Sequence, residues 1–482
     1  MKKLLFFTLL YMLTAQFSNA QKKTILNIKY ENFKDSVIQL SLPIYDAIFS
    51  ENEYAAREFS SQSSDGKFHF EFSLKNSIKL CIYTSTRNGL LFVPGTFNII
   101  INPGDSLNLT VRDNKEGLVN MEITGRGAER LLIAKEVLKK MNSNYIFKKP
   151  YHKQNITERY EQMDRWLDII DSMFNNHPKK NTRDFRLAKA QLVDQTLDAN
   201  ILQSVQQYDD SVKALFNKYI KHKKRIDPLL DSLTIDLFGG FHVLPAYIYL
   251  SNMGQLGERY DLFRYNYPLE YASLVQKEFA DISYVRDYLL SNNAISIFRK
   301  NWYDQISIDV FKFYVGNVQR NNPYFQYVTD EFNSLKEILR PGKPFYNFNL
   351  TDTNGLNHSL RDLRGKVVIL DFWFTGCGAC RTLVSALSKI EGKVKNDKIQ
   401  FVSINVDQTI SRWKTGIGIF SVPSALQLYT GGQRYDHPVI KFAKVTSYPT
   451  LIVLDKEGRI VGRPPHPYDD PEGFKKYVQN CL

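Results

Sequence analysis

The chain has 482 residues, of which 43% are hydrophobic and 23% are charged. This composition is that of a globular protein; it excludes wholesale disorder and a multi-spanning membrane protein, and the length predicts about two to four domains. Four cysteines are too few for a disulfide-dense scaffold. The net charge of +13 is spread thinly, which favours a basic solvated surface over nucleic-acid binding.

Residues 1–20 have the pattern of a secretory signal peptide. Lys2 and Lys3 are basic, residues 4–15 are mostly apolar, and residues 18–20 resemble a cleavage site. The apolar stretch is shorter than the ~20 residues that span a bilayer, although an uncleaved N-terminal anchor is the alternative. We therefore expect a protein of the periplasm or cell envelope, with no nucleic-acid partner and no transmembrane span after signal removal.

Residues 21–125 show an apolar period of two. Phe68, Phe70 and Phe72 alternate with polar side chains, and residues 102–105 read Asn-Pro-Gly-Asp, a turn between two short apolar runs. Short alternating runs separated by turns predict an antiparallel β-sandwich over this part of the chain.

Residues 126–340 change to a helical period. Met163, Trp166, Ile170 and Met173 share one helical face, so we predict an α-helical region. Its many Tyr and Phe residues favour a helical core over a ligand groove. Residues 341–344 read Pro-Gly-Lys-Pro, which interrupts the pattern and predicts a domain boundary.

Residues 341–482 alternate between strands and helices. Residues 367–373 form a near-continuous apolar run, typical of a central strand that is buried on both faces. Residues 399–405 and 450–454 are two more such runs, and the apolar positions of residues 377–390 share one helical face. This order predicts a multidomain chain that ends in an α/β domain with a central sheet.

The reactive chemistry is expected in the sequence Cys377-Gly-Ala-Cys380, directly after the first buried strand. A thiol at a helix N-terminus ionises readily, because the unpaired N–H groups and the helix dipole favour an anion. We expect Cys377 to attack a target disulfide and Cys380, one turn further, to resolve the mixed disulfide. Half of a zinc site is the alternative, but Cys81 and Cys481 are isolated from any second ligand pair, so we predict no metal.

Residues 341–482 resemble the thioredoxin-like thiol–disulfide oxidoreductases of the TlpA-like cell-envelope branch. The resemblance rests on residues 362–368, on residues 371–376 with the following C-x-x-C, and on residues 447–450 and 455–458. It implies a thioredoxin-like fold, a cis bond before Pro449, and substrate contacts at Gly376, Tyr448 and Pro449. It departs from the family at Gly376, where a tryptophan is usual, and in having Gly-Ala between the cysteines instead of Gly-Pro.

The resemblance also assigns a role to Asp371, six residues before Cys377. Its position is that of the buried acid that accepts the proton of the resolving thiol, here Cys380. The lysine that often lies near this acid is replaced by Ser403, so we expect a raised pKa for an uncompensated carboxyl. The alternative is that Asp371 lies at a strand edge and is solvated. The family also carries an insertion that matches residues 407–444, with an extra strand at residues 425–429.

These features predict a secreted enzyme that reduces protein disulfides, needs no cofactor, and draws electrons from a membrane donor. The alternatives are an envelope substrate-binding or scaffold protein with an accessory thioredoxin-like domain, or a thiol peroxidase. A peroxidase is disfavoured because Leu370 and Phe374 replace its required proline and threonine. Residues 21–340 resemble the β-rich and helical extensions of some relatives, and we expect them to select or present substrates.

Overall fold

A computed structural model describes residues 23–31, 38–45, 57–63, 65–74, 77–80, 83–86, 89–92, 99–111, 121–144, 153–206, 209–235, 243–252, 260–394 and 397–482. The chain divides into two compact units. Unit 1 comprises Met1–Phe263 and Leu274–Tyr288, and unit 2 comprises Arg264–Ser273 and Leu289–Leu482. The expected signal peptide at residues 1–20 lies outside the described residues. Among the described residues, no helix is both long and apolar enough to cross a membrane.

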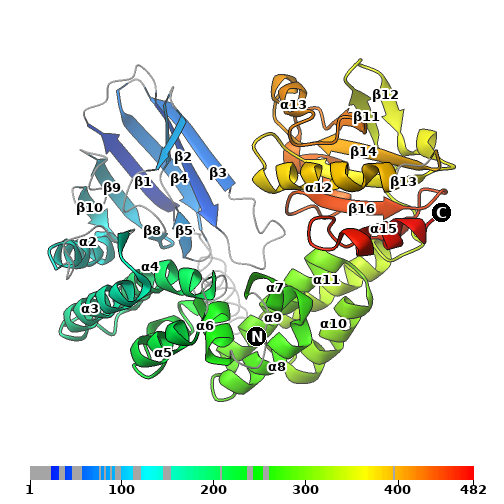
Figure 1. Cartoon of the computed structure of the whole chain (residues 1–482). Helices are drawn as coiled ribbons and strands as arrows, with labels where there is room; N and C mark the ends of the chain where they lie inside the picture. The colour runs from blue at the N-terminus through cyan, green and yellow to red at the C-terminus, as the bar shows by residue number, and fades with distance from the viewer. Residues whose placement is uncertain are drawn as a thin grey trace, which may run out of the picture. The chain divides into compact units, whose positions relative to one another are not determined.

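Two sheets form the β-rich part of unit 1 (Figure 1). One sheet has the order β10-β9-β1-β4, with bounds Glu122–Arg126, Ser106–Val111, Lys23–Tyr30 and Lys67–Ser73. The other sheet has the order β7-β6-β2-β5-β8, with bounds Gly89–Phe92, Tyr83–Thr86, Ile38–Tyr45, Ile78–Leu80 and Ile99–Ile101. Strand β3 (Arg57–Ser63) also pairs with β2.

The prediction of an antiparallel sandwich is wrong for one strand pair. Strand β1 pairs with β9 in parallel, from Ile25 opposite Ser106 to Tyr30 opposite Val111, so the first sheet is mixed. The period of two was interpreted correctly: Phe68 and Phe70 of β4 are buried, and their neighbours are exposed. An alternating pattern fixes which face of a strand is buried, but it does not identify the partner strand some 80 residues away.

Helices make up the middle of the chain. Unit 1 contains α2, α3, α4, α5, a π-helix η3, a 3-10 helix η4 and α6, with bounds Ala128–Asn142, Ile156–Asn175, Arg183–Gln206, Asp210–Phe216, Asn217–Lys221, Asp227–Leu230 and Val243–Asn252. Three helices, α7, α8 and α9, have residues in both units; their bounds are Tyr260–Asn266, Pro268–Glu278 and Ser283–Asn301. Helices α10 (Gln305–Asn317) and α11 (Phe325–Ile338) belong to unit 2. In α3 the predicted face is confirmed in part: Met163 and Ile170 are buried, whereas Trp166 and Met173 are only partly buried.

A seven-stranded sheet forms the C-terminal part of unit 2. Its order is β12-β11-β15-β14-β13-β16-β17, with bounds Asn357–Ser359, Asn349–Asp352, Leu426–Tyr429, Ile399–Asn405, Val367–Trp373, Thr450–Leu454 and Ile460–Gly462. The helices are η6, α12, α13, η7, α14 and α15, with bounds Leu360–Leu363, Gly378–Val394, Ile410–Gly416, Arg434–Asp436, Pro438–Phe442 and Pro471–Gln479. Every residue of β13 is buried, as its apolar run predicted. The expected extra strand in the insertion is β15.

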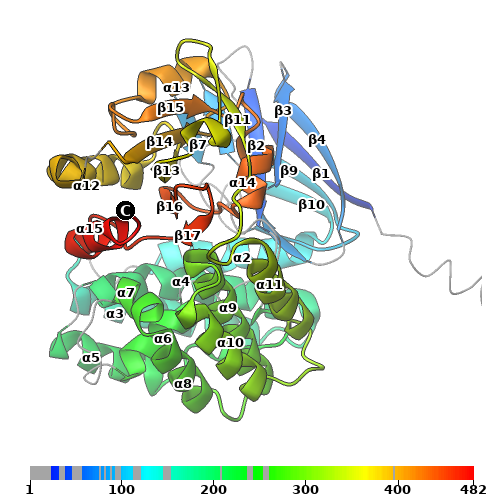
Figure 2. The same ribbon diagram turned by 90° about the vertical axis from the view of Figure 1, so that its right-hand side faces the viewer.

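Helices α12 and α15 cover one face of this sheet (Figure 2). Leu383 of α12 and Phe474 of α15 share one hydrophobic cluster with Val367 and Ile369 of β13. Because alternate residues of a strand point to the same side, residues 371 and 373 also face α12. This places an acid, Asp371, in the middle of an otherwise apolar interface.

Candidate active site

The two cysteines of the C-x-x-C sequence form a disulfide at the start of α12. Cys377 directly precedes the helix, and its carbonyl accepts the N–H of Arg381 at 3.1 Å. The sulfur of Cys377 accepts the backbone N–H of Cys380 at 3.0 Å. Cys377 therefore occupies the capping position of α12, where a thiolate can accept a first-turn N–H group and is favoured by the helix dipole. Both cysteines are buried in this oxidised state, with 5% and 1% of their surfaces exposed.

Aromatic side chains surround the disulfide. Trp373 and Trp413 are buried in one cluster with both cysteines. The ring of Trp413 stacks on Tyr429 at a centroid distance of 5.0 Å, which links α13 to β15. These contacts make the wall of the site apolar and closely packed. Neither Trp413 nor Tyr429 was identified from the sequence, because their approach to the cysteines depends on the path of residues 407–444.

Asp371 is buried, as the resemblance implied, and does not lie at a solvated strand edge. In β13 it lies between Ile369, which contacts the Leu383 cluster of α12, and Trp373, which contacts the cysteine cluster. Its Oδ2 accepts only a long hydrogen bond of 3.5 Å from the Ser403 hydroxyl, and Oδ1 has no partner among the described residues. Burial without a cation raises the pKa of Asp371 to about 7.

The loop before β16 lies against the same aromatic cluster. The peptide bond between Tyr448 and Pro449 is cis. Tyr448 packs on the cysteine cluster and meets Phe374 edge to face at 5.4 Å. Gly376, exposed beside Cys377, has a φ of 100°, and a Cβ there would meet nothing within 4 Å. The structure thus brings Tyr448, and with it the neighbouring Pro449, onto the cluster that holds the dithiol, and it leaves the surface open at Gly376.

A buried carboxylate that was not identified from the sequence holds the loop before Cys377. Asp407, just after β14, accepts the N–H of Thr375 at 3.0 Å and the side-chain amide of Asn405 at 2.9 Å. Arg412 of α13 donates to the Thr375 carbonyl at 3.1 Å and accepts the Thr375 hydroxyl at its own carbonyl. A signal was present: strands β13 and β14 are parallel, so the residues that follow them meet at one sheet edge.

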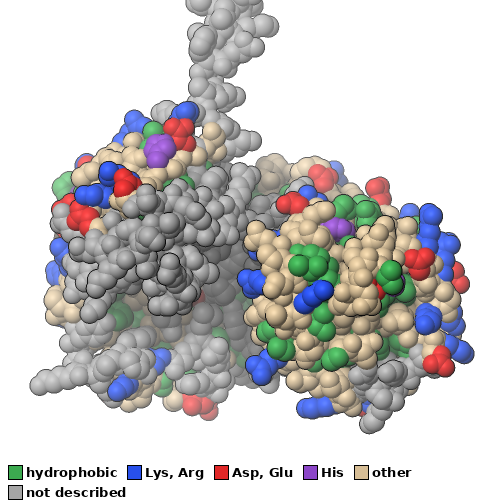
Figure 3. All heavy atoms as spheres, turned by 90° about the horizontal axis from the view of Figure 1, so that it is seen from above, with side chains coloured by type: hydrophobic (Ala, Val, Ile, Leu, Met, Phe, Trp, Pro, Cys, Tyr) green, Lys and Arg blue, Asp and Glu red, His purple; other side chains and the backbone are tan. Residues whose placement is uncertain are grey.

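The surface of this part of unit 2 is partly apolar. Ile410 of α13 and Ile419 are 55% and 48% exposed, and Ile417 and Phe420 pack against the cysteine cluster. In Figure 3 hydrophobic side chains lie among Lys and Arg side chains on the face of unit 2 that is seen from above. Acidic side chains lie on the same face, so this surface is partly apolar and carries charges of both signs.

Two cysteines remain besides the disulfide pair. Cys81 lies outside the described residues. Cys481 is a free, partly exposed thiol whose Sγ donates to the carbonyl of Tyr477 at 3.2 Å. Within the described part of the chain, no group of three or more His, Cys, Asp or Glu side chains is arranged to hold a metal ion.

Comparison with known proteins identifies the C-terminal domain. A family profile described as thioredoxin-like matches residues 365–460. The domain is thioredoxin-like. Its relatives include thiol-disulfide oxidoreductase ResA of Bacillus cereus, 27% identical over 128 residues, which are 27% of this chain and 71% of the relative. ResA of Bacillus subtilis is 29% identical over 126 residues, which are 26% of this chain and 68% of the relative.

Among solved structures, the thioredoxin domain of a thiol-disulfide oxidoreductase from Bacteroides vulgatus is 25% identical to this chain. The match covers 30% of this chain and 97% of that domain, with a TM-score of 0.26. The thioredoxin-like domain of this chain holds the disulfide of Cys377 and Cys380. The chain is therefore a thiol–disulfide oxidoreductase by class.

Proposed function

We propose that this protein reduces disulfides of proteins in the cell envelope through the Cys377–Cys380 pair. The observation that carries the proposal is the position of that pair: Cys377 caps α12, and the buried Asp371 lies on the strand face beneath the same helix. The arrangement supplies a stabilised nucleophile, a second thiol one turn away, and a group able to hold a proton at neutral pH.

The reaction proceeds in two exchanges. The thiolate of Cys377 attacks one sulfur of a substrate disulfide, a mixed disulfide forms, and the first substrate thiolate leaves. Cys380 then gives its proton to the Asp371 carboxylate and attacks the Cys377 sulfur. The internal disulfide forms, the second substrate thiolate leaves, and two electrons have passed from the protein to the substrate.

The roles of the surrounding groups follow from their contacts. Asp407 and Arg412 fix the backbone of Thr375, two residues before the nucleophile, so the direction of Cys377 is held by a hydrogen-bonded loop. Tyr448 and Pro449 form one side of the substrate groove, and the small Gly376 leaves room for a polypeptide to approach the sulfur.

The remaining steps of the cycle require a partner. The oxidised pair must regain two electrons from an outside dithiol, and the signal-like residues 1–20 support a place for this exchange beyond the cytoplasmic membrane. A membrane protein that exposes a reduced dithiol is the electron donor that we propose. Residues 21–340 then select or present the substrate.

Trapping of the mixed disulfide tests the proposed order of attack. Cys380→Ser should leave the mixed disulfide on Cys377 unresolved, so covalent complexes with envelope proteins should accumulate on non-reducing gels. Cys377→Ser should trap none, because the first attack is lost.

The matched control is Cys481→Ser, which removes a thiol outside the site and should reduce insulin at the wild-type rate. Equal trapping by the two active-site variants, or trapping by neither, would show that the order of attack is wrong. The redox potential of the Cys377–Cys380 pair tests the direction of the reaction. A value near the ~−270 mV of thioredoxin supports reduction of substrate disulfides, and one near the ~−120 mV of DsbA would instead support oxidation of substrate thiols.

A further inference from the structure

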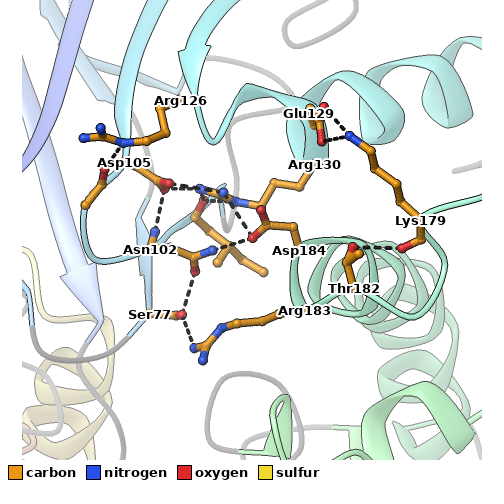
Figure 4. A network of polar contacts seen from close by, with 12 residues as sticks. Ser77, Asn102, Asp105, Arg126, Glu129, Arg130, Lys179, Thr182, Arg183 and Asp184 are labelled. Carbon is orange, nitrogen blue, oxygen red and sulfur yellow. Dashed lines mark hydrogen bonds and ion pairs between the residues drawn. The ribbon is translucent and has the colours of Figure 1, made fainter.

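Unit 1 contains a cavity of about 890 Å³ at one end of its mixed sheet, within the size range of small-molecule sites. Its walls come from the start of β1, the turn of residues 102–105 between β8 and β9, the end of β10, and the first residues of α4. Figure 4 shows the polar side chains at this place. They include both carboxylates and arginines. The two groups differ in how many of their hydrogen-bonding atoms already have partners within the protein.

The carboxylates of the cavity already have partners. Asp105 is buried, forms an ion pair with the buried Arg130, and accepts the backbone N–H of Asn102 at 2.7 Å. Asp184 accepts the side-chain amide of Asn102 at 2.7 Å and lies 3.5 Å from a terminal nitrogen of Arg130. Arg130 thus offsets the acidic charge from behind the cavity wall (Figure 4).

Two arginines that line the cavity have no carboxylate partner among the described residues. Arg126 uses its Nε to donate to the Gly104 carbonyl at 2.6 Å, which leaves both terminal nitrogens available. Arg183 makes one hydrogen bond, from Nη2 to the Ser77 hydroxyl at 2.8 Å. Both side chains are exposed, so their charges remain hydrated and need no partner within the protein.

Two helices begin at the cavity, and each has a carboxylate near its N-terminus: Asp105 lies beside Gly127 at the start of α2, and Asp184 lies in the first turn of α4. Helix α2 begins directly after Gly127, which lines the cavity and supplies no side-chain cap to the first N–H groups. Helix α4, of 24 residues, begins at Arg183 itself. The partial positive charge of a helix N-terminus stabilises these two carboxylates, so the attraction of a further anion depends on Arg126 and Arg183.

We propose that this cavity binds a small organic anion, held through a carboxylate or phosphate group by Arg126 and Arg183. The fork of a guanidinium matches the two oxygens of either group and forms paired, charge-assisted hydrogen bonds. The cavity is open to the surface, and its volume accommodates a small molecule. This site lies wholly in unit 1 and does not depend on the reaction of the dithiol.

Calorimetric titration of the full chain with two probes tests the proposal. Citrate represents organic carboxylates, glycerol 2-phosphate represents phosphate esters, and glycerol is the neutral control. At low salt we expect at least one anion to bind with a dissociation constant of ~1 mM or tighter, and added salt should weaken it. Preference for citrate identifies a carboxylate site, preference for the ester identifies a phosphate site, and equal binding shows that any oxyanion suffices.

Variants locate the binding. Arg126→Gln and Arg183→Gln should each weaken the bound probe ~10-fold, since each removes a charge-assisted contact. The matched control is Arg186→Gln, which changes an arginine of the same helix that pairs with Asp231 and does not line the cavity. The proposal is overturned if neither anion binds, or if the bound anion has the same affinity for both cavity variants and the control. Because the changed side chains are exposed, unaltered circular dichroism is expected throughout.

Discussion

At the scale of the residue, Asp371 combines two properties that normally conflict. A carboxyl buried in an apolar interface destabilises the fold when it is ionised, yet only the ionised form can accept a proton from Cys380. A pKa of about 7 keeps both forms populated near neutral pH. The position of Asp371 therefore suits the proton transfer that we propose, and it lowers the stability of the fold when the carboxyl is ionised.

This conflict makes stability depend on pH in a defined direction. The folded pKa is raised above the ordinary 3.8, so between about pH 4 and pH 7 the folded protein holds a proton that the unfolded chain has released. The stabilising contribution of the neutral acid is complete below pH 4 and is lost as the pH rises to 7, by at most about 4 kcal/mol. Asp371→Asn should remove this slope, so the variant should exceed the wild type in stability at pH 8 but not at pH 4.

Urea midpoints measured from pH 4 to pH 8 check this prediction, together with the single-turnover rate of resolution by Cys380. That rate should fall by ~10²-fold in Asp371→Asn, the low end for general-base catalysis. The control is Asp436→Asn, which changes an exposed acid of the same domain. Its urea midpoints should depend on pH in the same way as those of the wild type. Parallel midpoints for Asp371→Asn as well would mean that the carboxyl is solvated.

From the sequence we could identify those site residues that are recognisable from the residues next to them in the chain. The disulfide pair, the acid in the apolar strand and the proline before β16 each stand in a short, informative context. Asp407, Trp413 and Tyr429 were not found, because each reaches the site across a sheet edge or through the insertion. Their role depends on which strands are parallel, and periodicity does not report that.

At the scale of the element, α13 packs so tightly against β13 that its last residue must be glycine. A Cβ on the buried Gly416 would lie 2.7 Å from a ring carbon of Trp373 and 2.3 Å from the Thr375 hydroxyl. Both neighbours hold the nucleophile: Trp373 packs on the cysteines, and Thr375 lies in the hydrogen-bonded loop before Cys377. The glycine therefore sets how closely the insertion approaches the dithiol.

Gly416→Ala should destabilise the protein by about 1–3 kcal/mol, the usual cost of overpacking, and should slow insulin reduction by displacing the Trp373 ring. Gly316→Ala is a control of the same chemistry in α10. A Cβ there meets nothing within 4 Å, and alanine in a helix should stabilise by about 0.5–1 kcal/mol. Urea midpoints of the two variants should thus move in opposite directions. Equal shifts would contradict the close contact at α13.

At the scale of the whole molecule, local periodicity predicted which regions are rich in strands and which in helices, but not the parallel pair in the first sheet or how the regions group. The strands at 367–373, 399–405 and 450–454 were predicted at the bounds they have. Periodicity did not predict which regions form one compact unit. Helices α10 and α11 belong to the same unit as the thioredoxin-like sheet. Side-chain contacts over more than 100 residues produce this grouping, and they leave no periodic signal.

Two contacts join helices α9 and α11 to the thioredoxin-like domain within unit 2. Glu331 of α11 forms a half-buried ion pair with Lys444 at 2.7 Å. Arg463, after β17, donates to the Arg299 carbonyl at 2.5 Å and lies 5.9 Å from the Trp302 ring centroid. Burial lowers the pKa of Arg463 to about 10. Arg463 also donates to the hydroxyl of Thr450, so this junction holds the residue that follows the cis-proline Pro449.

A comparison of two fragments tests whether the helices stabilise the catalytic domain. Residues 340–482 contain the dithiol, Asp371 and the cis-proline loop, so we predict that this piece folds alone and reduces insulin. Residues 283–482 retain both contacts and should melt several degrees higher, because each kcal/mol shifts the melting temperature of a domain of this size by about 2–8 °C. Within the longer fragment, Glu331→Gln should remove no more than about 1 kcal/mol, as befits a partly exposed ion pair. Equal melting temperatures would show that the helices only adjoin the domain, and an insoluble shorter fragment would show that the two share one core.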